Sequence, residues 1–143
     1  MSTQPSTPKP VEELIQEFLA EGPYAVVGAS THRAKYGNKC LRVYQQRGLP
    51  VYPVHPAQEE IEGLKAYASL SDLPERVHGV SIITPPPVTE KIVEEAGRLG
   101  IPYLWMQPGA ESEKALARAA ELGIQTIAGG PCILVALGFR EEG

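Results

Sequence analysis

The sequence has few cysteines, no long apolar run and no excess of positive charge. Its two cysteines, Cys40 and Cys132, lack the Cys-x-x-Cys spacing of redox and zinc sites, so we expect both to be free buried thiols. The three histidines are scattered without the spacing of a ligand pair, which argues against a metal site. No apolar segment approaches the roughly 20 residues that a membrane-spanning helix needs.

The overall charge and the first residues narrow the class of protein further. A net charge of −4 over 143 residues disfavours nucleic acid and anionic membranes as partners. The opening residues, MSTQPSTPKP, are polar and proline-rich and do not form the apolar stretch of a signal peptide. We therefore expect a disordered leader over residues 1–10, a single domain over residues 11–143 and a cytoplasmic location.

Hydrophobic periodicity indicates alternating strands and helices after a first helix. Short crossovers between such elements favour right-handed strand–helix–strand units, and hence a parallel sheet covered on both faces. The sequence therefore predicts an α/β fold with three layers and a doubly wound parallel sheet of about five strands. Residues 129–143 are not assigned to an element, and a short strand is possible at 65–68. The expected helices cover residues 11–20, 37–47, 88–99 and 111–122, and the expected strands cover residues 24–28, 49–54, 79–84, 101–106 and 124–128.

Ligands of an open parallel sheet bind at the carboxyl ends of its strands, near the point where the winding reverses. Four segments emerge at that edge of the expected sheet. They are Gly28-Ala29-Ser30, Val54-His55-Pro56, Thr84-Pro85-Pro86 and Gln107-Pro108-Gly109. We expect the binding site to be built from these segments.

The first of these segments has the features of a phosphate-binding loop. Gly28 lets the backbone turn sharply and approach a ligand, so a valine there is expected to abolish binding in a protein that still folds. Ser30 can donate a hydroxyl group, and the following helix offers free N–H groups to an anion. Lys35, with Arg33 or Lys39, can supply positive charge. The alternative interpretation is that Gly28 only permits a turn and that the lysines are solvated.

Two features of a dinucleotide site are missing. The pattern G-x-G-x-x-G is absent from the glycine loop. The second expected strand ends in His55-Pro56, where an NAD-binding protein would have an acidic residue for the ribose. Both absences disfavour an ordinary dehydrogenase.

Several of these segments together resemble the family of small CoA-binding domains, which is similar to the CoA-binding domain of the succinyl-CoA synthetase α subunit. The resemblance lies in residues 26–30, 47–56, 67–70, 80–84 and 104–109. It implies a Rossmann-like fold and CoA as the cofactor, held by the glycine loop and by the ends of the second and third strands. Together with the positive charges near the loop, it leads us to predict these cofactor-binding residues: Gly28, Ala29, Ser30, Arg33, Lys35, His55, Pro56, Thr84 and Pro85.

The chain departs from the family pattern at four places. Lys35-Tyr36-Gly37 stands where the family often has Arg-Pro-Ser, and His55-Pro56 where Asn-Pro or Ser-Pro is common. Many members have Val-Phe-Arg where this chain has Ile83-Thr84-Pro85. Cys132 is displaced by one residue from the cysteine of the family, so the resemblance transfers no role to it.

Residues able to act as a catalytic nucleophile, acid or base are scarce near the expected site. His55 is better explained as a hydrogen-bond donor or a loop-packing residue than as a base. Glu111 is explained by the dipole of the helix that it begins, and Ser30 has no neighbouring base in sequence. The histidine that is phosphorylated in the synthetase, and its nucleotide-grasping partner, have no counterpart in this chain.

These observations favour a non-catalytic protein that binds CoA or an acyl-CoA, without nucleic acid or membrane partners. Two alternatives stay open at this stage. The first is a small enzyme, either an NAD(P)-dependent oxidoreductase or an acyl-transfer protein. The second is a subunit that provides the CoA site of a larger complex.

Overall fold

A five-stranded parallel sheet forms the centre of the molecule, and the computed structural model describes it within residues 9–141. Most of the expected leader, residues 1–8, therefore lies outside the described residues. The strands are β1 (Tyr24–Val27), β2 (Val51–Val54), β5 (Gly79–Ile82), β6 (Tyr103–Met106) and β7 (Gln125–Ile127). The helices are α1 (Val11–Leu19), α2 (Tyr36–Gln46), α3 (Pro86–Leu99), α4 (Glu113–Glu121) and α5 (Ile133–Leu137).

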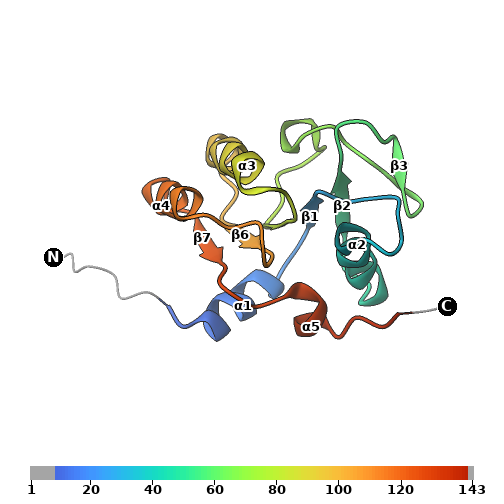
Figure 1. The fold of residues 1–143 in the computed structure, drawn as a ribbon, viewed down its shortest axis with the longest axis horizontal. Helices are drawn as coiled ribbons and strands as arrows, with labels where there is room; N and C mark the ends of the chain where they lie inside the picture. Colours follow the sequence, from blue (N-terminus) through green and yellow to red (C-terminus); the bar gives the residue numbers. More distant parts are fainter. Residues whose placement is uncertain (1–8, 142–143) are drawn as a thin grey trace, which may run out of the picture.

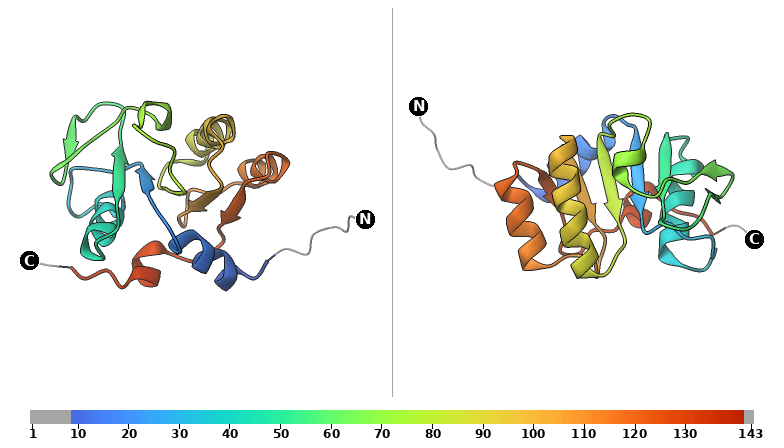
Figure 2. Two further views of the ribbon diagram at one scale, coloured as in Figure 1. Left: turned by 180° about the vertical axis from the view of Figure 1, so that it is seen from behind. Right: turned by 90° about the horizontal axis from the view of Figure 1, so that it is seen from above.

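Helices cover both faces of the sheet, which confirms the expected three-layer α/β fold (Figures 1 and 2). Helices α1, α2 and α5 pack on one face, and α3 and α4 pack on the other. Alternate residues of β1 serve the two layers because successive side chains of a strand point to opposite faces. Tyr24 and Val26 belong to the core under α1, α2 and α5, whereas Ala25 and Val27 belong to the core under α3 and α4.

The order of the strands shows where the winding reverses. The sheet has the order β2-β1-β5-β6-β7, so the chain leaves β1 through α2 to reach β2 at one edge. It then returns to place β5 on the other side of β1 and continues outward through α3 and α4. The reversal therefore lies between β1 and β5, and their carboxyl ends form the crevice in which such folds bind ligands.

Two helices begin two residues away from the expected position, whereas α2 begins one residue early. Helix α3 begins at Pro86 and not after the third proline, because proline is tolerated at the first positions of a helix, where no intrahelical N–H bond is needed. Helix α4 begins at Glu113 and not at Glu111. Its N-cap is Ser112, whose Oγ accepts a hydrogen bond of 3.0 Å from the backbone N–H of Ala115.

Two further features were unassigned or misplaced. The unassigned tail contains α5, which is one and a half turns long and apolar throughout, so its sequence has no readable periodicity. Of the possible strand at 65–68, Lys65 ends β4 (Leu64–Lys65), which forms an antiparallel hairpin with β3 (Glu60–Ile61), and Tyr67 forms an isolated parallel bridge with Val54. A short 3-10 helix, η1 (Leu70–Asp72), follows the hairpin.

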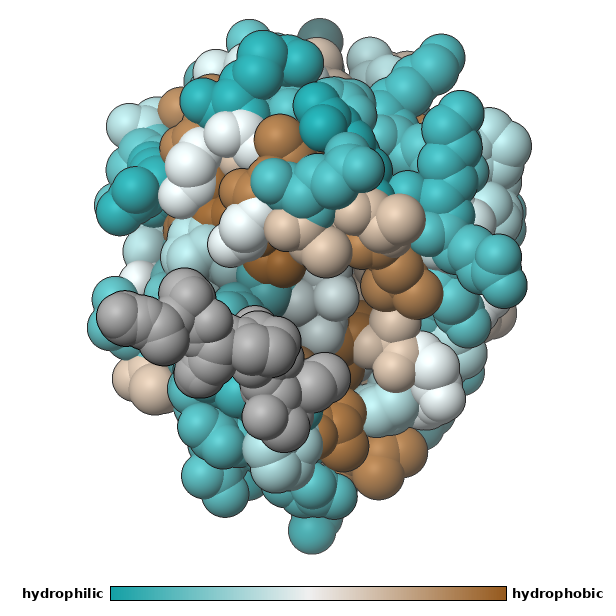
Figure 3. Space-filling view, turned by 90° about the vertical axis from the view of Figure 1, so that its left-hand side faces the viewer, coloured by the Kyte–Doolittle hydropathy of each residue, from teal (hydrophilic) through white to brown (hydrophobic). Residues whose placement is uncertain are grey.

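The outer faces of the helices are largely polar. On the face that Figure 3 presents, hydrophilic side chains predominate, and smaller hydrophobic areas lie between them. Among the described residues, no helix is both long enough and apolar enough to cross a membrane.

Candidate functional site

A cavity of about 660 Å³ lies at the carboxyl ends of β1, β2 and β5, where the winding of the sheet reverses. The beginnings of α2 and α3 complete its walls. Of the residues predicted to bind the cofactor, all except Arg33 line this cavity. These are Gly28, Ala29, Ser30, Lys35, His55, Pro56, Thr84 and Pro85.

The backbone of the loop requires a glycine at position 28. Its φ angle is +96°, and its N–H donates to the carbonyl oxygen of Val54 at 3.3 Å. A Cβ atom on Gly28 would lie 2.0 Å from the backbone oxygen of Ile83. We therefore expect a valine at position 28 to destabilise the fold, because the added side chain would meet the backbone that follows β5.

The loop and the start of α2 present free backbone N–H groups to the cavity. The N-cap of α2 is Lys35, which makes no capping bond with its side chain. The N–H groups of Ala29, Ser30, Tyr36 and Gly37 have no acceptor within residues 9–141, and all four residues line the cavity. Unpaired amides at a helix N-terminus, together with the positive end of the helix dipole, form a site for an anion.

Only one of the three cations considered from the sequence faces the cavity. Arg33 makes an ion pair of 2.6 Å with Glu62, which lies in the turn of the β3–β4 hairpin. Lys39 lies 3.4 Å from Glu141. Lys35 is exposed, lines the cavity and makes no ion pair with any residue that the structure describes. Its ammonium group is therefore available to a ligand.

Two polar side chains of the cavity, His55 and Ser30, keep a proton that they can donate to a ligand. His55 Nδ1 accepts bonds from the N–H groups of Ala57 at 2.9 Å and Gln58 at 3.1 Å. In the neutral imidazole ring, these bonds assign the proton to Nε2, which can then donate to a ligand. Ser30 Oγ accepts from the N–H of His32 at 3.0 Å and keeps its hydroxyl proton for a further bond.

The opposite end of the cavity is apolar and was not anticipated. Val88 and Ile92 line it, and Val88 is one of two large hydrophobic residues exposed in the described part of the chain. At the rim of the cavity, Glu95 Oε2 accepts two hydrogen bonds from Ser71, one from the backbone N–H at 3.0 Å and one from Oγ at 2.7 Å. The spacing of Val88, Ile92 and Glu95 by four and three residues places them on one face of α3, which is the sequence signal for this wall.

The beginning of α3 cannot share the role of the beginning of α2. Pro86 and Pro87 have no N–H groups. The next two N–H groups, of Val88 and Thr89, both donate to the carbonyl oxygen of Pro85, at 2.9 and 3.0 Å. An anion is therefore favoured at the α2 end of the cavity, and an uncharged group at the α3 end.

Gln107 lies beside the cavity but does not line it. Its buried Oε1 accepts bonds of 2.9 Å from both the Tyr36 hydroxyl and the N–H of Ile133. The Tyr36 hydroxyl also contacts Cys132 Sγ at 2.6 Å, and burial raises the pKa of this phenol. Both cysteines are free, as expected, but only Cys40 is buried, whereas Cys132 is half-buried. This cluster joins α5 to α2 and β6.

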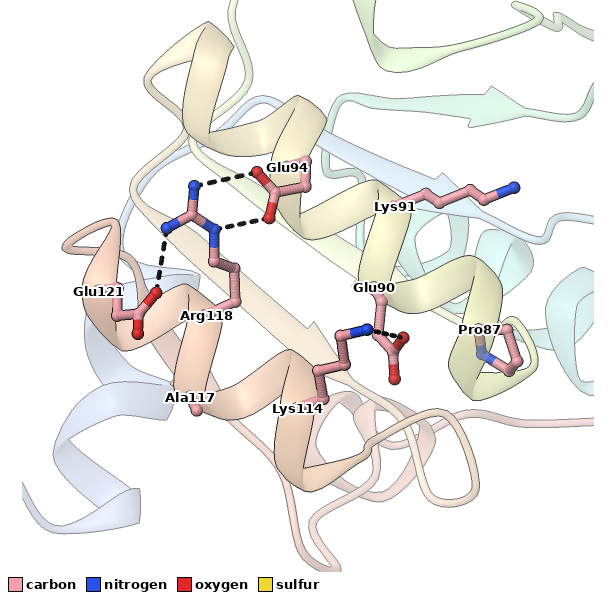
Figure 4. Close-up of a pocket in the computed structure, with 8 residues that line it drawn as sticks. All are labelled: Pro87, Glu90, Lys91, Glu94, Lys114, Ala117, Arg118 and Glu121. Atoms are coloured by element: carbon pink, nitrogen blue, oxygen red, sulfur yellow. Dashed lines mark hydrogen bonds and ion pairs between the residues drawn. The ribbon is translucent and has the colours of Figure 1, made fainter.

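A second groove runs between α3 and α4 (Figure 4). Arg118 makes bonds of 2.6 and 3.2 Å with the carboxylate of Glu94, and Lys114 lies 3.8 Å from Glu90. The side chain of Lys91 points away from these pairs. The charges in this groove are thus largely matched within the protein, which leaves the cavity beside Gly28 as the candidate site.

Comparison with known proteins identifies the family of this chain. The model of a family described as "CoA binding domain" matches residues 22–138. The chain belongs to this family of CoA binding domains. The match includes the glycine loop, all strands of the sheet and α5.

The similar proteins are of two kinds, namely ligases that are much longer than this chain and hypothetical proteins of similar length. The α subunit of an ADP-forming acetate–CoA ligase II of Pyrococcus furiosus is 31% identical over 132 residues, covering 84% of this chain and 28% of the relative. A conserved hypothetical protein of the same organism is 42% identical with a TM-score of 0.75, covering 79% of this chain and 97% of that one. A hypothetical protein of Pyrococcus horikoshii has a TM-score of 0.83 at 27% identity, covering 93% of this chain and 95% of that one. Against three curated ligases, this CoA binding domain spans only 11–28% of their length.

Proposed function

We propose that this domain binds CoA or an acyl-CoA in the cavity at the carboxyl ends of β1, β2 and β5, and that it catalyses no reaction by itself. The observation that carries the proposal is the group of four free N–H groups beside Lys35. CoA has a pyrophosphate group, which needs such donors, and it also has long uncharged portions. The cavity offers both environments at opposite ends.

The ligand is oriented by this difference between the two ends. The pyrophosphate lies against the N–H groups of Tyr36 and Gly37, where the dipole of α2 favours negative charge. Lys35 neutralises part of the phosphate charge, which matters because the protein itself has a net charge of −4. An uncharged portion of CoA then packs against Val88 and Ile92 of α3.

The absence of catalysis is proposed from the state of the cavity's titratable groups. Nδ1 of His55 is occupied by two backbone donors, and the carboxylate of Glu95 is held by Ser71. Ser30 Oγ bonds to the His32 N–H and has no base beside it among the hydrogen bonds of residues 9–141. Ser30 therefore lacks the adjacent base that a nucleophile needs.

Titration calorimetry with CoA and NADH, side by side on the purified chain, tests the proposal. We expect CoA to bind at least about tenfold more tightly than NADH, a difference of roughly 1.4 kcal/mol. Equal or tighter binding of NADH would support the small oxidoreductase instead. Incubation with acetyl-CoA tests the acyl-transfer alternative, since we expect no release of free CoA above the rate in buffer.

A further inference from the structure

Arg42 on α2 is a buried charged residue that the cavity does not include. Its side chain is only 5% exposed. Its Nε donates to Oδ1 of Asn38 at 2.6 Å, and one terminal nitrogen donates to the backbone oxygen of Arg33 at 2.7 Å. The other terminal nitrogen lies 3.5 Å from Glu141, whose side chain is 58% exposed. Burial of an arginine is unfavourable unless its N–H groups donate hydrogen bonds. The two shortest of these bonds hold the side chain of Asn38 and the carbonyl group of Arg33 in place.

Asn38 carries the connection to the other end of the loop. It is fully buried, and its Nδ2 donates to the backbone oxygen of Ser30 at 2.8 Å and to Glu62 at 2.9 Å. Arg42 and Asn38 together thus hold the carbonyl groups at both ends of the segment from Ser30 to Arg33.

This segment has few other attachments. The bonds of the His32 and Lys35 N–H groups are made within the loop itself, to Ser30 Oγ and to the His32 oxygen. Among residues 9–141, residues 30–34 are joined to the rest of the protein by the bonds from Asn38 and Arg42, by the exposed Arg33–Glu62 pair, and by the bond from the Lys35 N–H to the His32 oxygen. The buried polar pair on α2 is therefore what determines the path of the loop.

We propose that Arg42, acting directly and through Asn38, is a positioning residue that holds the Ser30–Arg33 segment in the conformation that binds the phosphates of CoA. The inference rests on the proposed function, because it assigns these residues a role at the same site. The guanidinium acts through its geometry: its fixed fork reaches Asn38 and the Arg33 carbonyl at once. A lysine would retain the charge but could not make both bonds from the same place.

The test uses Arg42→Met and Arg42→Lys, with Lys39→Met as the matched control. Lys39 lies on the same helix and faces the same Glu141 carboxylate, but it makes no bond to the loop in the described part of the chain. Two quantities are measured for each protein. They are the NMR order parameters of the backbone amides of residues 31–34 and the affinity for CoA by calorimetry.

In the wild type and in Lys39→Met we expect order parameters near 0.85 and equal affinities. In both Arg42 variants we expect the order parameters of residues 31–34 to fall below about 0.6, those of β5 to stay unchanged, and CoA to bind at least about tenfold more weakly. If Arg42→Met does not fold, Arg42→Lys decides by the same two measurements. An ordered loop in the folded Arg42 variants would overturn the inference, as would recovery of full affinity by lysine. Failure of the wild type to bind CoA would refute the proposed function alone, because the order parameters test the positioning role separately.

Discussion

Lys35 and Gly28 contribute to the site in different ways, one through charge and the other through backbone shape. Lys35 is exposed in the free protein and faces the cavity, so its effect should appear in binding and not in stability. Gly28 lies where β1 approaches the backbone after β5 closely, so its effect should appear in stability. Substitutions at the two positions are therefore expected to have separable effects.

Lys35→Ala should weaken CoA binding by about 1.5–3 kcal/mol, the range for hydrogen bonds to charged groups. Because water screens an exposed ammonium group, we expect the lower end of that range. Lys39→Ala is the control, since Lys39 is directed toward Glu141. The measurement is calorimetry at low and moderate salt, where the difference between wild type and Lys35→Ala should shrink as salt rises. Identical affinities for all three proteins would place the cationic contact elsewhere.

Gly28→Ala should destabilise the fold more than Gly109→Ala, although the φ angles of the two residues are +96° and +97°. At Gly109 nothing lies within 4 Å of an added Cβ, so only the strained backbone contributes, about 1–2 kcal/mol. At Gly28 the clash with the Ile83 carbonyl adds at least about another 2 kcal/mol. Urea unfolding of both variants measures the difference. Equal losses would show that the backbone after β5 moves aside easily.

Several residues of the cavity were predictable because the end of a parallel strand fixes their place. Gly28, His55 and Thr84 follow three such strands, and the sheet brings them together. Arg33 was placed in the site from its closeness in sequence to Lys35, but it pairs with Glu62, which is 29 residues away. The free N–H groups of Tyr36 and Gly37 were expected only in general terms, because backbone donors leave no signature in the side chains.

Among the elements, the β3–β4 hairpin joins α2 through Glu62. Hydrogen bonds from Asn38 and then Arg33 lower the pKa of this carboxyl group below its ordinary value of 4.5. A carboxyl whose pKa is lowered in the folded protein stabilises the fold above its unfolded pKa, and this contribution disappears as the pH falls through the folded pKa. The attachment of the hairpin is therefore expected to weaken in acid.

Glu62→Gln should lower the free energy of unfolding by about 1.5 kcal/mol near pH 7, the lower end of the range for hydrogen bonds to charged groups, because its partner Arg33 is exposed. The difference from wild type should diminish as the pH falls below 4.5 and through the lowered pKa of the folded protein, where the wild-type carboxyl also becomes neutral. Urea unfolding at both pH values measures it, with the exposed Glu59→Gln of the same segment as the control. A difference that does not depend on pH would mean that Glu62 acts by packing and not by charge.

The elements that could be read from the sequence are those with a clear period or a glycine after them. Helix α3 ends at Gly100, which has a φ angle of +72°, and this end was predicted. Helix α5 was not, because five apolar residues in a row show no alternation. The hairpin was missed because each of its strands has only two residues and its turn contains Glu62 at a φ angle of +51°. A positive φ angle at a glutamate is not readable from residue type.

For the molecule as a whole, the alternation of strands and helices was enough to predict the doubly wound sheet. Parallel neighbours need crossovers of one hand, so few topologies remain once the elements are known. The strand order then locates the cavity between β1 and β5. The alternation does not predict which side chains lie in the second groove, between α3 and α4. The pairing of Arg118 with Glu94 there depends on how the two helices pack.

The central claim is that the phosphates of CoA bind at the beginning of α2, and amide chemical-shift mapping by NMR tests it most directly. On addition of CoA to the ¹⁵N-labelled protein, the largest shifts should occur at the amides of Ala29, Ser30, Tyr36 and Gly37, because their free N–H groups gain acceptors. The amides that line the groove between α3 and α4, such as that of Ala117, should stay in place. Large shifts at that groove, with none at the four loop amides, would contradict the account.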